Sequence, residues 1–486
     1  MEPWLSHPFD DDKLKEECGI FGAVNVQDAA NFVALGLHAL QHRGQEAGGI
    51  ITFDADRGFQ SAHRFGLVRD NFTSAKLMET LPGSIGIGHV RYSTAGSKGA
   101  TAIRDVQPFF GEFSMGGAAI AHNGNITNAE AIRRELIERG SIFQSSSDSE
   151  CIIHLMARSI QKTHAERLKD ALRRCEGAFS VIAMTRTKLI GVRDKLGVRP
   201  LVLGRIGDGW ALASETCALD IIGAEFIREI EPGEMVVIDK KGVVSSRPFE
   251  RTSPRFCIFE QVYFSRPDSI IGGRSVYETR RQIGVELARE APVEADLVCP
   301  VPDSGTPAAI GYSQESGIPF AMGIVRNQYM GRTFIEPSEQ IRNMGVRLKL
   351  NVNRALIAGK RVVLVDDSVV RGTTSQKIKE MILEAGAKEV HFRIASPPTT
   401  WPCFYGVDTP ERSKLLAARM TEDEMRDFIG VDSLKFVSLD GLYRAAGEVE
   451  GRNNSCPQFC DACFSGEYPV APSDMIERGF ELKAAE

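Results

Sequence analysis

The fold is decided by Val362-Val363-Leu364-Val365-Asp366-Asp367-Ser368-Val369-Val370-Arg371-Gly372-Thr373-Thr374. An apolar strand runs into two adjacent acids, and a Gly/Thr loop then leads into a helix. At the carboxyl end of a parallel strand, this arrangement directs backbone N–H groups and the positive helix end toward a phosphate. The two acids would repel that phosphate, so we expect them to bind ribose hydroxyls or a hard cation such as Mg²⁺. For any one residue, a strand-to-helix turn with capping acids is the alternative; the whole string favours the phosphate site.

Around this string, strand and helix patterns alternate. The predicted strands are 297–300, 361–365 and 389–395, and the predicted helices are 308–315 and 375–385. Apolar strands separated by helices predict a parallel, doubly wound sheet. A second loop follows the strand that ends at Pro300, and its Ser304 could supply an oxygen to the metal.

The pattern differs between Cys18 and about Val244, where short strands bounded by Gly, Asn or Asp occur beside helices. We predict strands at 85–92, 118–122, 179–184 and 189–193, and helices at 32–41 and 127–139. Thr127 and Glu130 form a capping-box start for the second helix. Layered sheets with helices outside are the expected architecture. A charged stretch with a proline, 239–255, is the predicted linker.

Length, net charge and the distribution of apolar residues limit the classes of protein to which the chain can belong. A chain of 486 residues is too long for one ordinary core, so we expect at least two domains. A net charge of -6 does not indicate a protein that binds nucleic acid. No run of about 18 apolar residues predicts a membrane span. The acidic residues 1–17 resemble neither a secretory signal nor a transit peptide, so a cytoplasmic protein is expected.

Cys18-Gly19-Ile20-Phe21-Gly22 begins a strand, and a lone cysteine before glycine is ordinarily a packing residue. Further motifs favour a catalytic role for Cys18 over a packing role. They are Gln41-His42-Arg43-Gly44-Gln45, His89-Val90-Arg91-Tyr92-Ser93-Thr94-Ala95-Gly96, Ala121-His122-Asn123-Gly124 and Ser146-Ser147-Asp148-Ser149-Glu150. In this order they resemble the glutaminase domain of the N-terminal-nucleophile amidotransferases. The resemblance implies a four-layer αββα fold.

Amide hydrolysis requires a nucleophile, a base and donors for the developing oxyanion. If Cys18 is the first residue of the mature chain, its own α-amino group can serve as the base, since its pKa lies near neutrality. By resemblance, Asn123 and Gly124 form the oxyanion hole, and glutamine is bound by Arg91, Thr94 and Asp148. Local roles could coexist with these, because Asn-Gly is a good turn dipeptide and aspartate a good N-cap.

The 362–374 string resembles the phosphoribosyl pyrophosphate loop of type I phosphoribosyltransferases. The resemblance implies that this substrate is bound by Asp366, Asp367, Ser368, Val370, Arg371, Gly372, Thr373 and Thr374. One Mg²⁺ per subunit is expected on Ser304, Asp366 and Asp367.

Cys460-Asp461-Ala462-Cys463 is a CxxC pair, and Cys257 and Cys403 lie far away in sequence. By spacing alone the group could be a zinc site, an iron–sulfur site or a redox pair. Four thiolates satisfy either metal, so the residues leave this choice open.

From Cys18 to Pro469 the chain resembles the glutamine phosphoribosylpyrophosphate amidotransferase family. In one branch, which has a propeptide and one [4Fe-4S] cluster per subunit, the ligand positions match Cys257, Cys403, Cys460 and Cys463; Cys456 is expected to be a non-ligand. The implied division is a propeptide at 1–17, a glutaminase domain at 18–245, a phosphoribosyltransferase domain at 256–470 and a tail at 471–486.

The resemblance implies that glutamine is hydrolysed at Cys18 and that ammonia attacks C1 of phosphoribosyl pyrophosphate, giving phosphoribosylamine, glutamate and pyrophosphate. This is the first step of purine biosynthesis, and feedback inhibition by purine nucleotides and a homotetramer are implied with it. A hexose-phosphate amidotransferase is one alternative, although it has no need of the ribose loop. A regulator that senses phosphoribosyl pyrophosphate is another, although it would carry a DNA-binding module rather than a glutaminase domain.

Overall fold

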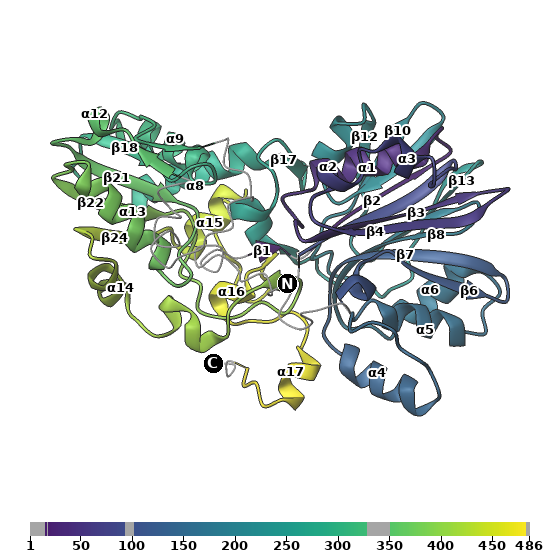
Figure 1. Cartoon of the computed structure of the whole chain (residues 1–486). Coiled ribbons are helices and arrows are strands. Elements are labelled where there is room, and N and C mark those ends of the chain that lie inside the picture. Colours follow the sequence, from purple (N-terminus) through teal and green to yellow (C-terminus); the bar gives the residue numbers. More distant parts are fainter. Residues whose placement is uncertain (1–14, 17, 93–101, 328–349, 483–486) are drawn as a thin grey trace.

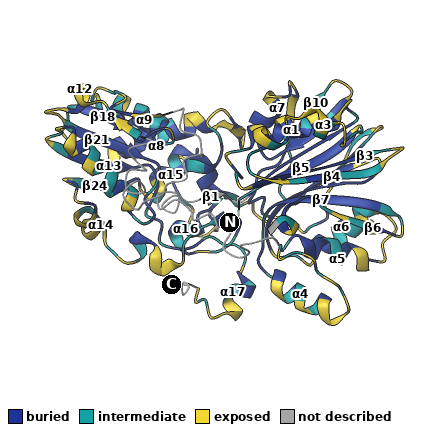
Figure 2. Cartoon of the chain, in the orientation of Figure 1, coloured by how far each residue is buried: buried dark blue, intermediate teal, exposed yellow. Residues whose placement is uncertain are grey.

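The computed structural model describes residues 15–16, 18–92, 102–327 and 350–482. The chain forms two lobes, with the first part of the sequence in one and the second part in the other (Figure 1). Both lobes contain buried sheets, and the exposed residues lie mainly on the surrounding helices and loops (Figure 2). None of the helices in these ranges is long and apolar enough to cross a membrane.

The first lobe contains two antiparallel sheets. The seven-stranded sheet has the order β12 (Glu225–Glu229), β10 (Val202–Ile206), β11 (Gly209–Ala213), β2 (Cys18–Val24), β5 (Ile85–Arg91), β3 (Ala47–Asp54) and β4 (Gly58–Phe65). The six-stranded sheet has the order β14 (Gly242–Ser246), β13 (Met235–Asp239), β9 (Leu189–Arg193), β8 (Gly177–Met184), β7 (Gly116–Ile126) and β6 (Phe109–Phe113).

These sheets are the inner layers of a four-layer structure. Ile20 and Ile87 of one sheet pack with Ile182 and Leu189 of the other in a common core. Helix α1 (Ala29–Ala39) covers the outer face of the seven-stranded sheet, and α4 (Ala129–Glu138), α5 (Glu150–Arg158) and α6 (His164–Leu172) cover the six-stranded sheet. Because both faces of β2 are covered, all seven of its residues are buried. The predicted αββα arrangement is confirmed.

The second lobe is built on a parallel sheet with the order β18 (Leu297–Pro300), β21 (Arg361–Asp366), β22 (Glu389–Ile394) and β24 (Ser433–Phe436). A bridge from Val298 to Phe320 adds an extended segment on the far side of β18. If the five segments are numbered in chain order, their spatial order across the sheet is 2-1-3-4-5. This is the strand order of a doubly wound fold whose switch point lies between the first and third strands.

Helices cover both faces of this sheet. Val363 and Val365 pack with α8 (Val276–Glu290), α9 (Thr306–Ser316) and α15 (Leu439–Ala445). Val362 and Leu364 point the other way and pack with α13 (Thr373–Glu384) and α14 (Glu422–Ile429). Apolar residues are therefore required at the four central positions of β21, 362–365, as the doubly wound prediction assumed.

Some details of the sequence prediction differ from the structure. The 239–255 linker begins too early, because β14 pairs with β13 as an edge strand whose exposed polar residues resemble a linker. Strand β24 was not predicted. The Thr127 capping box is absent: α4 begins at Ala129, and its free N–H groups bind the carboxylate of Asp474, which is distant in sequence.

The lobes meet across buried charges. Arg43 Nη2 lies 2.8 Å from Glu260 Oε2, and Arg199 Nη1 lies 3.0 Å from Glu260 Oε1. Arg43 also pairs with Glu215. Burial alone would raise the pKa of Glu215, and the neighbouring Arg43 and His42 reverse this, so that its pKa lies well below the usual range. Removing one partner would leave a buried charge uncompensated, which is costly.

Candidate active site

The predicted nucleophile occupies the start of a central strand. Cys18 is the first residue of β2, is buried, and lies opposite Arg91 in β5. Gly19 has no room for a side chain, since an added Cβ would lie 3.0 Å from Val90 and 3.1 Å from Leu40. Close packing on both sides therefore fixes the backbone that carries the Cys18 thiol.

The predicted oxyanion residues lie near the end of β7. Asn123 is fully buried, and neither polar atom of its side chain has a hydrogen-bond partner within the described ranges. Gly124 has a φ of +135°, and an added Cβ would lie 2.1 Å from the Ala178 carbonyl oxygen. Glycine is therefore required here, and Asn123 keeps a buried amide available to bind a ligand.

Two of the predicted glutamine-binding residues, Arg91 and Asp148, each have polar partners, Arg91 at Asp105 and Asp148 at β7 and in the 146–149 segment. Arg91 Nη2 lies 3.6 Å from Asp105 Oδ2, and Asp105 accepts from the Ser146 amide at 2.7 Å. Asp148 accepts a hydrogen bond from the Ile126 amide at 2.9 Å. Asp148 was also a candidate N-cap, and this was wrong, because α5 begins at Glu150 with Ser149 before it.

Asp148 also lies beside His122 of the oxyanion strand. His122 Nδ1 lies 2.8 Å from Ser149 Oγ and 3.8 Å from Asp148 Oδ2. Burial lowers the pKa of His122, and the negative charge of Asp148 partly opposes this. Thr94, the third predicted glutamine-binding residue, lies outside the described residues.

The second predicted site forms at the switch point of the parallel sheet. Pro300 and Val365 are opposite each other, so the loops after β18 and β21 leave the sheet side by side. Asp366 and Asp367 are each 2% exposed. Ser304 Oγ donates a short hydrogen bond to Asp367 Oδ2. The structure thus brings together the three residues predicted to hold Mg²⁺.

The loop that follows the acids leads into a helix start. Ser368 Oγ donates to Asp367 Oδ1 at 2.6 Å, and Gly372, with a φ of +81°, immediately precedes α13. Thr373 and Thr374 form the first turn of that helix, and Val370 is buried beside Arg371. Backbone N–H groups of the first turn have no partner inside a helix, which suits them to a phosphate.

Arg280 lies close to this site and was not predicted. Its guanidinium is buried and donates to the carbonyl oxygens of Gln261 at 2.9 Å and Ser265 at 2.7 Å. Burial lowers its pKa to about 10, and the charge of Asp367 acts in the opposite direction. An isolated arginine on a predicted helix is ordinarily expected at the surface. The sequence therefore offers no reason to single out Arg280 as a site residue.

The buried network of Arg43, Arg199, Glu215 and Glu260 was also missed. Arg43 lies inside the Gln41–Gln45 motif, which was the one available signal. Its partner Glu260 is 217 positions away in the sequence, and no local pattern joins them.

The predicted cysteine ligands line one small cavity of about 20 Å³, which contains Cys257, Cys403, Cys460 and Cys463. Strands β15 (Phe256–Cys257) and β25 (Phe459–Cys460) are parallel and bring two of these cysteines opposite each other. Burial raises the pKa of Cys257 to about 12 and also raises those of Cys460 and Cys463. Cys456 is exposed and does not line the cavity.

Within the described part of the chain, no group of three or more His, Cys, Asp or Glu side chains is arranged to hold a single metal ion. The four thiols nevertheless line one cavity. A single zinc would need sulfur atoms about 3.8 Å apart, given a Zn–S bond near 2.3 Å and a tetrahedral site.

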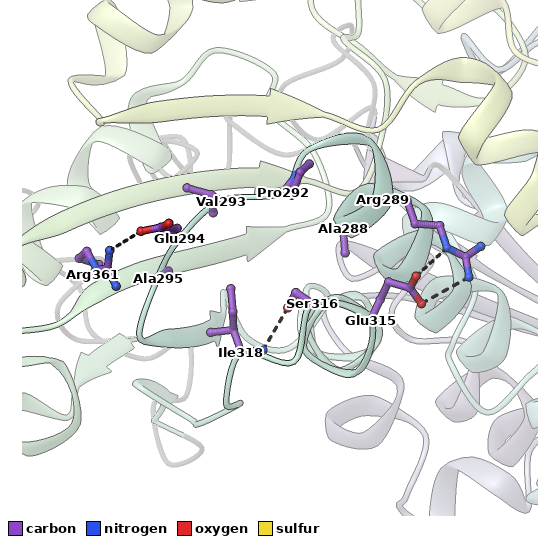
Figure 3. A pocket seen from close by; sticks show the side chains of 10 residues that line it. All are labelled: Ala288, Arg289, Pro292, Val293, Glu294, Ala295, Glu315, Ser316, Ile318 and Arg361. Carbon is purple, nitrogen blue, oxygen red and sulfur yellow. Dashed lines mark hydrogen bonds and ion pairs between the residues drawn. The ribbon is translucent and has the colours of Figure 1, made fainter.

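A cavity of about 390 Å³ lies elsewhere, at the opposite end of the parallel sheet (Figure 3). Its arginines are paired with acids: Arg289 with Glu315 at 2.8 Å, and Arg361 with Glu294 at 3.4 Å. Arg361 begins β21 and Asp366 ends it, which separates the cavity from the switch point by about 16 Å. The cavity is larger than the cysteine pocket but contains no predicted site residue.

Comparison with known families matches both parts of the chain. A family described as a glutamine amidotransferase domain matches residues 95–220, and one described as a phosphoribosyl transferase domain matches residues 280–395. A solved structure described as the allosteric regulatory enzyme of purine biosynthesis has a TM-score of 0.88 and 44% identity, covering 93% of this chain and 96% of its own. Glutamine phosphoribosylpyrophosphate amidotransferase from Bacillus subtilis, complexed with ADP and GMP, has a TM-score of 0.87 and 44% identity, covering 94% and 98%.

Curated proteins are similar over nearly the whole chain. The amidophosphoribosyltransferase of Rhizobium etli is 57% identical over 469 residues, which is 95% of this chain and 94% of that protein. The amidophosphoribosyltransferase of Bacillus subtilis is 46% identical over 459 residues, or 94% and 95%. With both domains matched and such identity over full length, the chain belongs to the amidophosphoribosyltransferase family, enzymes that catalyse the first step of purine biosynthesis.

Proposed function

We propose that the two lobes divide the reaction, with glutamine hydrolysis at Cys18 and ribose amination at the switch point of the parallel sheet. The observation that carries this proposal is that one chain holds a cysteine opening a buried central strand and, separately, two acids and a hydroxyl at a doubly wound switch point. Each arrangement suits one half of the chemistry.

In the first half, the Cys18 thiolate attacks the glutamine amide carbon, and the α-amino group of the mature Cys18 accepts the thiol proton. The Asn123 amide and the Gly124 N–H stabilise the developing oxyanion. Arg91 binds the substrate carboxylate and Asp148 its amino group, and Thr94 is a further glutamine-binding residue. Support comes from the buried, unpartnered Asn123 amide, from the pairing of Arg91 with Asp105, and from Asp148, whose carboxylate lies close to His122 of the oxyanion strand.

In the second half, ammonia attacks C1 of phosphoribosyl pyrophosphate and pyrophosphate leaves. Asp366 and Asp367 accept hydrogen bonds from ribose hydroxyls, and the loop that follows them binds the 5-phosphate. The loop residues are Ser368, Val370, Arg371, Gly372, Thr373 and Thr374.

The oxygen donors fit one Mg²⁺ per subunit. Two buried carboxylates and the Ser304 hydroxyl are hard ligands, and substrate phosphates would complete the coordination that Mg²⁺ prefers. When bound, Mg²⁺ would neutralise charge on the leaving pyrophosphate. Ammonia released into water would be largely protonated, so a sheltered path between the lobes belongs to the proposal.

For the cysteine cavity we propose a [4Fe-4S] cluster, one per subunit, as the resemblance to the propeptide-containing branch of the family implies. Its donors are thiols alone, at Cys257, Cys403, Cys460 and Cys463, and the rest of its lining is neutral. A cluster would supply a structural tie between the segment after the first lobe, the end of the second lobe and the tail. Since burial keeps these thiols protonated, loading must release protons.

The wider proposals follow the family. Residues 1–17 are a propeptide, 18–245 the glutaminase domain, 256–470 the phosphoribosyltransferase domain and 471–486 a tail. Purine nucleotides are the expected feedback inhibitors, as the ADP and GMP complex of the Bacillus subtilis relative suggests. A homotetramer and a cytoplasmic location complete the proposal; reduced thiols fit that compartment.

The division of labour can be tested with two variants. Cys18→Ala should lower glutamine-dependent pyrophosphate release by about 10³-fold or more, and should leave release with added ammonium within about twofold. Asp366→Asn with Asp367→Asn should lower both activities together, because ammonia then has no activated ribose to attack. Loss of ammonium-dependent activity in folded Cys18→Ala protein would contradict the two-site scheme.

The cluster can be tested by metal analysis of protein purified without oxygen. About four irons per chain and a brown colour are expected for a [4Fe-4S] centre. Cys460→Ser should lose iron and soluble yield, whereas Cys456→Ser, at an exposed position outside the cavity, should keep both. Colourless protein with one zinc per chain would refute the assignment.

A further inference from the structure

A short segment of the second lobe lies directly against the oxyanion strand of the first. Gly406, just before β23 (Val407–Asp408), is so close that an added Cβ would lie 2.9 Å from the Cα and 3.0 Å from the carbonyl carbon of Gly124. Both glycines have positive φ, +97° at Gly406 and +135° at Gly124. A side chain at position 406 would press against the Gly124 backbone, so this close approach requires a glycine at position 406.

Hydrogen bonds hold the same segment in place on both sides. Asn125 Nδ2, next to Gly124, donates to the Phe404 carbonyl oxygen at 2.9 Å. The Tyr405 carbonyl oxygen accepts from Arg199 Nε at 2.8 Å.

Together with further contacts, these hydrogen bonds form a closed circuit that begins and ends on the oxyanion strand β7. The Arg199 carbonyl oxygen accepts from Ser180 Oγ at 3.1 Å, and Ser180 lies opposite Asn123 in the pair β7–β8. A continuous chain of contacts therefore runs from Asn123 through Ser180, Arg199 and residues 404–406 back to Gly124. Ser180, Arg199 and Tyr405 are all buried, so water does not compete for these bonds.

We propose that Phe404–Gly406 is a positioning segment for the oxyanion hole, so that the second lobe sets the orientation of the Gly124 N–H. The proposal rests on the function proposed above for Asn123 and Gly124. An oxyanion donor acts only when it lies about 2.7–3.1 Å from the developing charge. A glycine has little intrinsic preference for one backbone conformation, and the Gly406 backbone packs against the Cα and carbonyl carbon of Gly124, which restricts the conformation of the residue that carries the N–H.

The test is Gly406→Ala, with Gly386→Ala as the matched control. Gly386 has a φ of +95°, almost the same as Gly406, but an added Cβ there would meet only Ala358 at 3.5 Å, an ordinary contact. Both substitutions therefore place an alanine at a similar positive φ, and only the one at position 406 presses on Gly124. We expect kcat with glutamine to fall about 10- to 100-fold in Gly406→Ala relative to Gly386→Ala. Ammonium-dependent release of pyrophosphate should stay within about twofold of the control.

Two further measurements keep the result interpretable. Alkylation of Cys18 by iodoacetamide needs no oxyanion donor, so its rate should be equal in both variants. Asn125→Asp replaces the donor to the Phe404 carbonyl with an acceptor and should also lower glutamine turnover selectively, without placing any atom against Gly124. Glutamine turnover equal to the control in Gly406→Ala, or a parallel fall in the glutamine and ammonium activities, would overturn the proposal. Wild-type enzyme without glutamine-dependent activity would instead refute the proposed function itself.

Discussion

His89 is a residue of the glutamine motif whose environment gives it an unusual titration. It lies on β5 opposite Ile20, is fully buried, and neither ring nitrogen has a hydrogen-bond partner among the described residues. Burial, followed by the charges of Arg91 and His122, lowers its pKa to about 3. The imidazole of the folded chain is therefore neutral at neutral pH.

This pKa predicts a loss of stability in mild acid. In the unfolded chain His89 binds a proton below about pH 6.5, whereas in the folded chain it does so only near pH 3. The free energy of unfolding should therefore fall as pH decreases through that window. His89→Gln should reduce the slope by up to about 1.4 kcal/mol per pH unit. Unfolding measured at pH 7 and pH 5 tests this, with His38→Gln, at an exposed position of α1, as the control.

Helix α4 illustrates how a distant residue completes an element. Asp474 of the short helix α17 (Ser473–Glu477) accepts from the amides of Glu130 at 2.7 Å and Ala131 at 3.2 Å. Thr127, predicted as the cap, donates instead to the Ala471 carbonyl oxygen at 3.2 Å. The tail therefore supplies the cap of a helix that begins three residues after β7.

Removing this cap should destabilise the first lobe. Asp474→Ala should lower the free energy of unfolding by about 1 kcal/mol, the usual value of an N-cap side chain. Glu477→Ala is the control, because the pair of Glu477 with Arg134 is exposed and such pairs contribute little. Thermal unfolding of both variants provides the comparison. Equal midpoints would show that the Asp474 carboxylate does not stabilise α4.

Periodicity predicted the elements that are apolar through several turns or residues. Strands β9 and β18 have the predicted bounds, and α13 begins two residues before its predicted start. Strand β24 was missed because only Leu434 and Phe436 of its four residues are buried. Contacts between distant residues, such as the Asp474 cap and the Arg43–Glu260 pair, leave no local pattern and were accessible only from the structure.

The site was predictable where chemistry is concentrated in a motif. The Asp366–Thr374 loop and Ser304 lie together as expected, because parallel strands bring their carboxyl ends to one edge. The cysteines were brought together by resemblance rather than by spacing, since Cys257 and Cys460 meet only through the pairing of β15 with β25. Arg280 and residues 404–406 were not predicted, because their roles depend on packing between distant segments.

At the level of the whole molecule, the segment before Cys18 crosses from one lobe to the other. Strand β1 (Lys15–Glu16) is antiparallel to β23, with Lys15 opposite Asp408 and Glu16 opposite Val407 (Figure 1). Val407 is buried and lines the cysteine cavity. The segment that precedes the nucleophile therefore pairs with the second lobe next to the proposed cluster.

The last prediction is that the mature enzyme begins at Cys18. With residues 1–17 attached, the Cys18 nitrogen is an amide and cannot act as a base at neutral pH. The Cys18 thiol can attack the preceding carbonyl to form a thioester, which water opens to release the leader and a free α-amino group. Intact-mass analysis of active enzyme should give a chain that starts at Cys18, and Cys18→Ala should keep its leader. A fully active enzyme that starts at Met1 or Glu2 would exclude the α-amino base.

The retained leader gives a second readout of the same prediction. In the Cys18→Ala background, Lys15→Cys with Asp408→Cys should form a disulfide, since directly opposed residues of antiparallel strands lie about 4.5–5.5 Å apart at Cα. Lys15→Cys with Glu411→Cys is the out-of-register control. If the cross-link forms and the otherwise natural chain still loses its leader, the leader must pair with β23 before cleavage and leave it afterwards. Absence of the cross-link in the uncleaved chain would mean that the leader reaches Cys18 by another path, although the requirement for a free α-amino group would stand.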